Sequence, residues 1–336
     1  MKKVIKIFLI ILIASFFPYT AKAQFNLPTL KDVKSTLLLT PSPTTPLPES
    51  SITVTADLRG LNNNGSNYTW FLNGVRQVNS SGLNKNVFTL VTGKIGTIYR
   101  VNVSAATPSG ENLSETINLT VSDVDLTWTS NSKGPVFYRA KLLPTQNSIV
   151  TISALPFIYK PGTKNQISSE SLIYNWIIDD KLDSLKSGIN RQSYVFRNND
   201  SLGNKIIRLE IKTQDNAVSL IKEISIPVAR PQILLYFSDS STSRPYGIAL
   251  KNVIAKTANF NFVAEAYFFT VPIKNLTLLW FINNTEVKGL DEKPWLANLN
   301  LSDHSFGQLS TQIKVTAQNP DNELETSQSI VNLEIK

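Results

Sequence analysis

Hydrophobic and polar residues alternate with a period of two along most of the chain, and the clearest alternation surrounds three tryptophans. The three segments are Tyr68–Gly74, Tyr174–Asp180 and Leu278–Asn284. In the first of them, alternation places Tyr68, Trp70 and Leu72 on one face of a strand, which we expect to face a core. Each segment ends in two residues drawn from Asn, Asp and Gly, which suit the positive φ angles of a type I′ turn. The pattern therefore predicts a strand and a tight hairpin, three times over.

The spacing of these segments predicts the size of the repeating unit. The central tryptophans, Trp70, Trp176 and Trp280, lie 106 and 104 residues apart, which matches one β-sandwich of about 100 residues plus a short join. A glycine and a second alternating run follow each tryptophan, at Gly96 and Tyr99–Val103, Gly203 and Ile207–Ile211, and Gly307 and Ile313–Ala317. The sequence therefore predicts an all-β chain with three tandem immunoglobulin-like (PKD-like) β-sandwich domains after an N-terminal signal peptide.

The repeat also suggests where the parts of the chain begin and end. We assign a signal peptide to 1–23, a proline-rich lead or linker to 24–48, and the three domains to 49–122, 123–229 and 230–336. Prolines at the density found in 40–48 favour extended polyproline II and do not fit a central strand, so the first strand is expected at Ser51–Asp57. Residues 24–39 fit either a flexible stalk or a short helix.

The second and third copies share their openings. Leu126–Ser130 aligns with Leu234–Ser238, which pairs Trp128 with Tyr236, and we interpret both aromatic residues as structural. The next core strand of each copy is expected at Ile149–Phe157 and Phe260–Phe269.

The first 23 residues have the composition of an export signal. Three lysines precede the apolar run Ile7–Phe17, and Ala21-Lys22-Ala23 follows, which is the basic, apolar, small-residue order of a secretory signal. The apolar run has eleven residues, short of the roughly 20 that span a bilayer. We therefore expect cleavage after Ala23 and an extracellular or cell-surface location. An uncleaved N-terminal membrane anchor is the alternative, and it would be the only membrane contact.

Charge and cysteine content exclude several classes of function. The chain has a net charge of +8, and leaving out the four lysines of the first 23 residues lowers it to +4. Such a weak field, without clustered Lys and Arg among aromatics, predicts no nucleic-acid partner. The absence of cysteine removes disulfides, thiolate metal sites and thiol nucleophiles together. Only 17% of residues are charged, and abundant Asn, Ser and Thr beside Val, Ile and Phe favour β structure.

The sequence contains no recognisable catalytic, cofactor or metal site. Its one histidine, His304, lies in a polar turn, so neither a Ser–His–Asp triad nor a multi-histidine metal site can be assembled. Asp179, Asp180 and Asp183 form the densest acidic cluster and leave calcium binding open. Turn chemistry explains these aspartates equally well, because Asn and Gly occupy the equivalent turns of the other copies. We predict no cofactor and no enzymatic activity.

Trp295 is the one residue for which we predict ligand contact. It has no counterpart in the other copies and follows Pro294 in a loop-like stretch, where an exposed indole would stack on a sugar or anchor in a partner. An indole folded over the edge of its own domain is the competing interpretation.

The chain from residue 35 to 336 resembles the secreted Ig-like or PKD-like β-sandwich repeat proteins of candidate-phyla, Parcubacteria-type bacteria. The resemblance rests on Trp70–Gly74, on Ser81-Gly82 through Lys94–Thr97, and on Val136–Leu142. It implies an exported sandwich array and carries no agreed activity or ligand. PKD domains usually have Trp-Asp-Phe-Gly-Asp-Gly where this chain has Trp-Phe-Leu-Asn-Gly, so Ig-like is the closer description.

These observations favour a non-catalytic extracytoplasmic protein that is a structural or adhesive spacer, or a protein-interaction module, at the cell surface. Its partner would be an unknown cell-surface protein or a glycan. One alternative is a carbohydrate-binding surface module, which glycan quenching of tryptophan fluorescence, lost in Trp295→Ala, would support. A second alternative is an uncharacterised glycan-active enzyme, which would cleave a polysaccharide.

Overall fold

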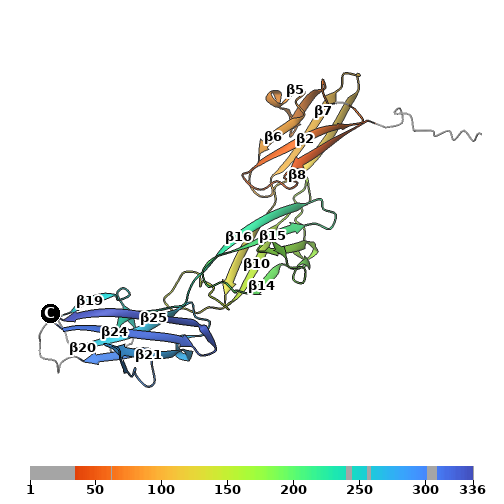
Figure 1. Ribbon diagram of the computed structural model, residues 1–336. Coiled ribbons are helices and arrows are strands. Elements are labelled where there is room, and N and C mark those ends of the chain that lie inside the picture. Colours follow the sequence, from red (N-terminus) through yellow and green to blue (C-terminus); the bar gives the residue numbers. More distant parts are fainter. Residues whose placement is uncertain (1–34, 62, 240–243, 256–258, 301–308, 336) are drawn as a thin grey trace, which may run out of the picture.

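The computed structural model describes residues 35–61, 63–239, 244–255, 259–300 and 309–335. The expected signal peptide, His304 and Gly307 lie outside these ranges. Within them the chain is all-β, with six sheets that pair into three sandwiches in sequence order (Figure 1). No helix in the described ranges has the length and apolar character needed to cross a membrane.

The first sandwich packs a three-stranded sheet against a sheet built around the Trp70 strand. The first sheet has the order β1 (Thr36–Ser42), β2 (Ser51–Arg59), β6 (Val87–Val91). The second has the order β4 (Val75–Arg76), β3 (Asn67–Leu72), β7 (Ile98–Ala106), β8 (Asn112–Thr120), with β5 (Gly82–Leu83) also paired to β3. A 3-10 helix, η2, covers Val78–Ser80.

The second sandwich repeats this plan. Its first sheet has the order β14 (Ser193–Arg197), β10 (Ile149–Phe157), β9 (Asp123–Ser130). Its second has the order β12 (Lys181–Leu182), β11 (Ile173–Ile178), β15 (Gly203–Lys212), β16 (Ser219–Val228), with β13 (Gly188–Ile189) paired to β11 and 3-10 helix η3 at Ser169–Ser171.

The third sandwich adds short strands to the same plan. Its first sheet has the order β18 (Pro245–Tyr246), β17 (Gln232–Ser238), β20 (Asn259–Tyr267), β23 (Leu296–Asn300). Its second has the order β19 (Asn252–Ala255), β25 (Asn322–Ile335), β24 (Leu309–Asn319), β21 (Thr277–Ile282), β22 (Thr285–Val287), with 3-10 helix η4 at Ile273–Asn275. The β19–β25 pair is parallel, whereas the other strand pairs in the described ranges are antiparallel.

The three hairpins after the tryptophan strands form where the sequence predicts them. Both central residues of each turn have positive φ: 50° and 83° at Asn73-Gly74, 48° and 60° at Asp179-Asp180, and 48° and 67° at Asn283-Asn284. Asn, Asp and Gly are the residues that tolerate this conformation, and the paired positive φ angles match the twist of the flanking strands.

The three repeated tryptophans form the centres of the three cores, as the alternation predicts. Trp70 and Trp176 are 0% exposed and Trp280 is 2% exposed. Each indole N–H donates a 2.8 Å hydrogen bond to a backbone carbonyl, at Lys85, Arg191 and Pro294 respectively. A buried indole needs such a partner, and the same solution occurs in every copy.

The proline-rich lead differs from expectation at one end. Thr36–Ser42 is a strand that pairs with β2 along seven residues, instead of a stalk, short helix or polyproline segment. Pro41 fits because β1 is the edge strand of its sheet, where a missing N–H costs no ladder bond.

The alignment of Trp128 with Tyr236 is displaced by one residue. Trp128 faces the core of the second sandwich, whereas Tyr236 lies on the outer face of its sheet and its neighbours Leu235 and Phe237 face the core. Because side chains alternate along a strand, a one-residue shift exchanges the two faces completely.

The first and second sandwiches meet at a buried joint. Only Val121 and Ser122 separate β8 from β9, and both residues are fully buried. The Ser122 N–H donates to the Pro46 carbonyl (3.0 Å), and the Tyr159 N–H donates to Ser122 Oγ (3.1 Å). Asp123 pairs with Lys222 at 3.0 Å. The two hydrogen bonds of Ser122 tie the end of the first sandwich to the start of the second, and the Asp123–Lys222 pair fixes the first residue of β9 within the second sandwich.

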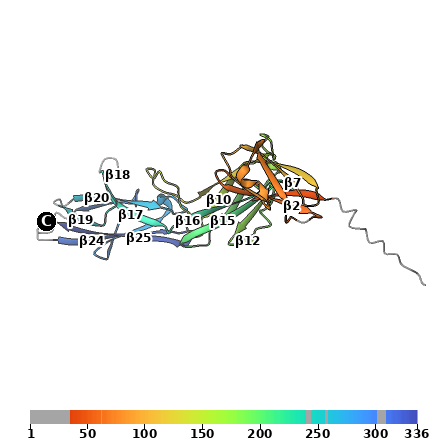
Figure 2. The same cartoon turned by 90° about the horizontal axis from the view of Figure 1, so that it is seen from above.

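The second joint is closed by a loop of the second sandwich that lies on the third. Residues 131–148, between β9 and β10, carry Lys133, which exchanges backbone hydrogen bonds with Phe268 (2.7 Å) and Phe269 (2.6 Å) of the third sandwich. Figures 1 and 2 show the three sandwiches following one another in an extended, bent array, with the first and third at opposite ends.

Candidate functional site

A cavity of about 950 Å³ lies at the joint between the second and third sandwiches. The β9–β10 loop supplies one wall, with Lys133, Val136, Phe137 and Arg139. The outer face of the third sandwich supplies the rest, with Tyr236 of β17, Glu265 of β20, Arg244, Tyr246 of β18, and Val271–Ile273. The site therefore exists only when the two sandwiches are docked.

The outer face of β20 explains why the loop docks there. Val263 and Tyr267 point away from the core of the third sandwich but are still buried, because Tyr138 and Leu142 of the loop cover them. The Tyr138 ring meets Tyr267 edge to face at a centroid distance of 5.6 Å. A strand that is apolar on both faces needs a cover on each, and the second sandwich provides the outer one.

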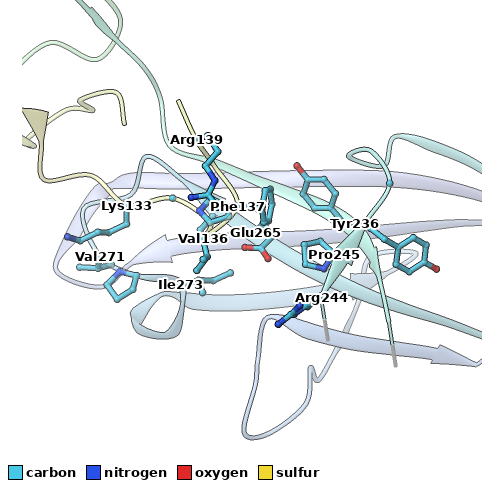
Figure 3. Close-up of a pocket in the computed structure, with 16 residues that line it drawn as sticks. Lys133, Val136, Phe137, Arg139, Tyr236, Arg244, Pro245, Glu265, Val271 and Ile273 are labelled. Carbon is cyan, nitrogen blue, oxygen red and sulfur yellow. The ribbon is translucent and has the colours of Figure 1, made fainter. Parts of the chain in front are cut away.

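Glu265 is the charged residue on this outer face, between Val263 and Tyr267. Its side chain is half-buried and has no hydrogen bond or ion pair to any residue in the described ranges. Burial raises the pKa of its carboxyl to about 7. Figure 3 shows the carboxylate among the lining side chains, near Phe137 and Pro245.

Aromatic rings and cations surround this carboxylate. Phe137 is 46% exposed and meets Tyr236 edge to face at 6.2 Å, and Tyr246 is 57% exposed. Lys133 and Arg139 are exposed on the loop side of the cavity and make no side-chain ion pair within the described ranges. The cavity thus combines stacking surfaces, positive charge and one carboxylate that has no partner in the part of the chain that the structure describes.

Glu265 makes the stability of the third sandwich depend on pH. Because its folded pKa is raised from 4.5 to about 7, ionisation above pH 7 penalises the folded state, by about 1–3 kcal/mol. The neutral Glu265 carboxyl therefore leaves the third sandwich at its full stability below about pH 4.5, and this stability is lost as the pH rises through 7. We expect Glu265→Gln to raise the melting temperature at pH 8 and to leave it nearly unchanged at pH 4.5.

Differential scanning calorimetry from pH 4.5 to 8 measures this dependence. Glu286→Gln, an exposed carboxylate of the same sandwich, is the matched control and should leave the pH profile unchanged. Variant and parent differ only at Glu265, so the difference between their pH profiles reports that carboxyl group. Equal slopes for parent and Glu265→Gln would contradict the assignment.

Trp295, the predicted ligand contact, lies in the segment before β23. Its indole is half-buried and packs against the core of the third sandwich and against the outer-face cluster that contains Tyr236. Its carbonyl accepts a 2.8 Å hydrogen bond from the Ala264 N–H. Its role in ligand binding stays a prediction.

The aspartate cluster of the second sandwich is spread over separate contacts. Asp179 pairs with Lys205 at 2.6 Å, and Asp180 lies 3.5 Å from Arg208. Asp183 accepts a 2.9 Å hydrogen bond from the Tyr194 hydroxyl and caps its own turn. Among the described residues, no three His, Cys, Asp or Glu side chains are grouped to hold a metal ion.

Sequence reasoning missed the cavity because its walls come from two copies of the repeat. The signal that points to it is Glu265 within the otherwise apolar stretch Phe262–Phe269, where an acid interrupts a strand that has no polar face. The docking of the loop, on which the cavity depends, leaves no short-range pattern in the sequence.

No family model and no curated protein matches the chain. Among solved structures, it is similar to the three N-terminal domains of the outer capsid protein Hoc of bacteriophage RB49, with 10% identity, 90% of this chain and 99% of that chain covered, and a TM-score of 0.27. It is also similar to the central fibronectin-III array of RIM-binding protein, with 12% identity, coverages of 90% and 97%, and a TM-score of 0.29. For Sidekick-1 immunoglobulin domains 1–5 the identity is 12%, the coverages 87% and 58%, and the TM-score 0.24. The chain is an all-β array of three tandem immunoglobulin-like β-sandwiches.

Proposed function

We propose that the chain is an exported, non-catalytic spacer and interaction module, which holds three sandwiches in a fixed extended order at the cell surface. The observation that carries this proposal is that both joints are buried and hydrogen-bonded. An ordinary interdomain connection is mobile by default, whereas these connections have almost no free linker.

The first joint supports the proposal through its length and burial. Thr120, Val121, Ser122 and Val124 are at most 3% exposed, so the chain passes from one sandwich to the next through a small core. Thr120 Oγ1 also donates to the carbonyls of Lys160 (3.3 Å) and Thr163 (3.2 Å). Bending at this point would break these contacts, which favours a stiff array.

The second joint adds buried polar contacts across the boundary. Thr145 of the second sandwich and Glu325 of the third are both fully buried, and the Thr145 hydroxyl donates to Glu325 Oε1 at 3.4 Å. A stiff array holds a binding surface at one end away from the point of attachment at the other by the full length of the array. This separation is useful for presenting a binding surface and does nothing for catalysis.

Surface labelling of intact source cells tests the location. With a C-terminal epitope on the full-length chain, we expect a membrane-impermeant, lysine-reactive biotin reagent to label the protein on intact cells or in the medium. A variant lacking residues 1–23 is the matched control and should be labelled only after lysis. Protection of the full-length chain until lysis would contradict the proposal.

The junction cavity favours carbohydrate binding as the second candidate function, because stacking rings and hydrogen-bonding side chains converge there. A third hypothesis, a glycan-active enzyme, differs from both candidates because it would release new reducing ends from a polysaccharide. Pure protein incubated with polysaccharides should release none, and reproducible release would overturn the non-catalytic assignment.

A further inference from the structure

We propose that the cavity at the joint between the second and third sandwiches is a binding site for an acidic carbohydrate, such as an oligosaccharide that contains uronic acid. The proposal deepens the interaction role given above and rests on it for its biological setting, but the binding itself is a property of the purified protein. Four features of the cavity lead to this ligand class.

The first feature is charge. Lys133 and Arg139 line the loop side of the cavity, and neither makes an ion pair within the described ranges. Arg244 lines the opposite side. Against Lys133 and Arg139 the cavity lining holds one carboxylate, Glu265. The excess of positive charge favours a ligand that carries anionic groups, and guanidinium pairs with carboxylates in bidentate fashion.

The second feature is the unpaired carboxyl group of Glu265. It is half-buried on the outer face of β20 and has no hydrogen-bonding partner among the described residues. A ligand made only of anionic groups would leave this carboxyl unsatisfied or repel it. Sugar hydroxyls donate and accept hydrogen bonds, so they satisfy Glu265 in either protonation state.

The third feature is the pair of accessible rings. Phe137 and Tyr246 are 46% and 57% exposed although both line the cavity. The edge-to-face contact with Tyr236 holds the Phe137 ring at 6.2 Å, so the ring is already oriented before a ligand enters. The apolar faces of pyranose rings stack on such surfaces, with little ordering cost when the ring is held in advance.

The fourth feature separates a sugar from a peptide. The cavity opens on the face of β17 and β20, whose backbone groups pair with each other from Gln232 and Tyr267 to Phe237 and Phe262. An added peptide strand needs an open sheet edge, whereas β17 and β20 are the two inner strands of their sheet. The edge strand β18 meets the cavity at Pro245 and Tyr246, and Pro245 has no N–H to donate to an added strand. Recognition through rings, cations and a carboxyl is the chemistry that a charged sugar uses.

Isothermal titration calorimetry with purified chain expressed from Gln24 tests the proposal. The probes are oligogalacturonate, alginate oligomers and hyaluronan oligomers, with neutral cello-oligosaccharides and poly-glutamate as comparisons. We expect at least one acidic oligosaccharide to bind and the neutral sugars to bind at least tenfold more weakly. Phe137→Ala and Arg139→Gln should each weaken the acidic sugar by about tenfold, the effect of losing one such contact.

Arg76→Gln is the matched control, because Arg76 is an exposed arginine of the first sandwich. Phe137 and Arg139 are exposed, so unchanged melting temperatures should show that their variants fold.

Binding of none of the three acidic sugars, or binding that Phe137→Ala and Arg139→Gln leave intact, would overturn the site. Tight binding of poly-glutamate with loss in both variants would reassign the site to acidic peptides. Because the assay uses pure protein, an absence of sugar binding would not bear on export or on the spacer role. Equally, an absence of surface labelling would not bear on sugar binding.

Discussion

Replacing Trp176 by alanine is expected to cost the second sandwich about 3–5 kcal/mol of unfolding free energy. Trp176 is fully buried, its ring lies 5.5 Å from that of Tyr194, and its indole N–H bonds the Arg191 carbonyl. Alanine removes the ring and the hydrogen bond and leaves a cavity between two sheets that cannot collapse onto it. For a domain of about 100 residues this loss lowers the melting temperature by more than about 10 °C.

Urea unfolding followed by circular dichroism measures this effect. Leu185→Ala, in the same sandwich, is the control, since Leu185 is 88% exposed and should change stability by less than about 0.5 kcal/mol. Trp70→Ala and Trp280→Ala should behave like Trp176→Ala in their own sandwiches, because each indole has the same burial and the same bond. A small loss at Trp176 would mean that the repeated tryptophan is not the centre of the core.

Replacing Glu325 by alanine is expected to cost about 3 kcal/mol and to loosen the second joint. Glu325 is fully buried, and its Oε2 accepts hydrogen bonds from the Thr270 N–H (3.0 Å), the Thr270 hydroxyl (2.8 Å) and Asn319 Nδ2 (2.7 Å). Its Oε1 accepts from Thr145 of the second sandwich. Alanine removes the acceptor of the Thr270 N–H and leaves Asn319 Nδ2 with only Thr270 Oγ1, at 3.2 Å, so a buried polar network loses its centre.

Calorimetry of Glu325→Ala tests this expectation, with Glu323→Ala as the matched control. Glu323 is exposed two residues earlier in the same strand, so its loss should be nearly neutral. Glu325→Gln keeps one oxygen acceptor and should fall between the two. If Glu325→Ala and Glu323→Ala unfold alike, Glu325 has no part in holding the joint.

Repetition made the cores and hairpins predictable. Any one of the tryptophan strands is an ambiguous short apolar run, but three copies with equivalent turn residues leave one common interpretation. The turn at Asp179-Asp180 shows the strength of this signal, because both residues take positive φ although neither is glycine. Period-two alternation and turn-forming residues depend only on neighbouring positions, so they can be recognised from the sequence alone.

Features that depend on strand pairing or on docking between sandwiches were not predictable in this way. Thr36–Ser42 contains Pro41 and lies next to further prolines, so its composition did not predict a strand. The segment is an edge strand because it pairs with β2. Tyr236 was aligned with Trp128, one residue out of step, because the outward side of Tyr236 is covered by a loop that starts about a hundred residues earlier. The same long-range docking creates the cavity around Glu265. No residue spacing in the sequence predicts this cavity.

Distances across the two joints, measured by double electron–electron resonance, test the stiff array most directly. The chain has no cysteine, so cysteines introduced at Val75, Leu182 and Ile254, which are 65%, 55% and 66% exposed, can be spin-labelled in pairs without side reactions. The pairs Val75 with Leu182 and Leu182 with Ile254 span the first and second joints. We predict one narrow distance distribution for each pair, centred on the separation of the two residues in the structure. A broad distribution for either pair would show that its joint swings freely and would contradict the stiff array.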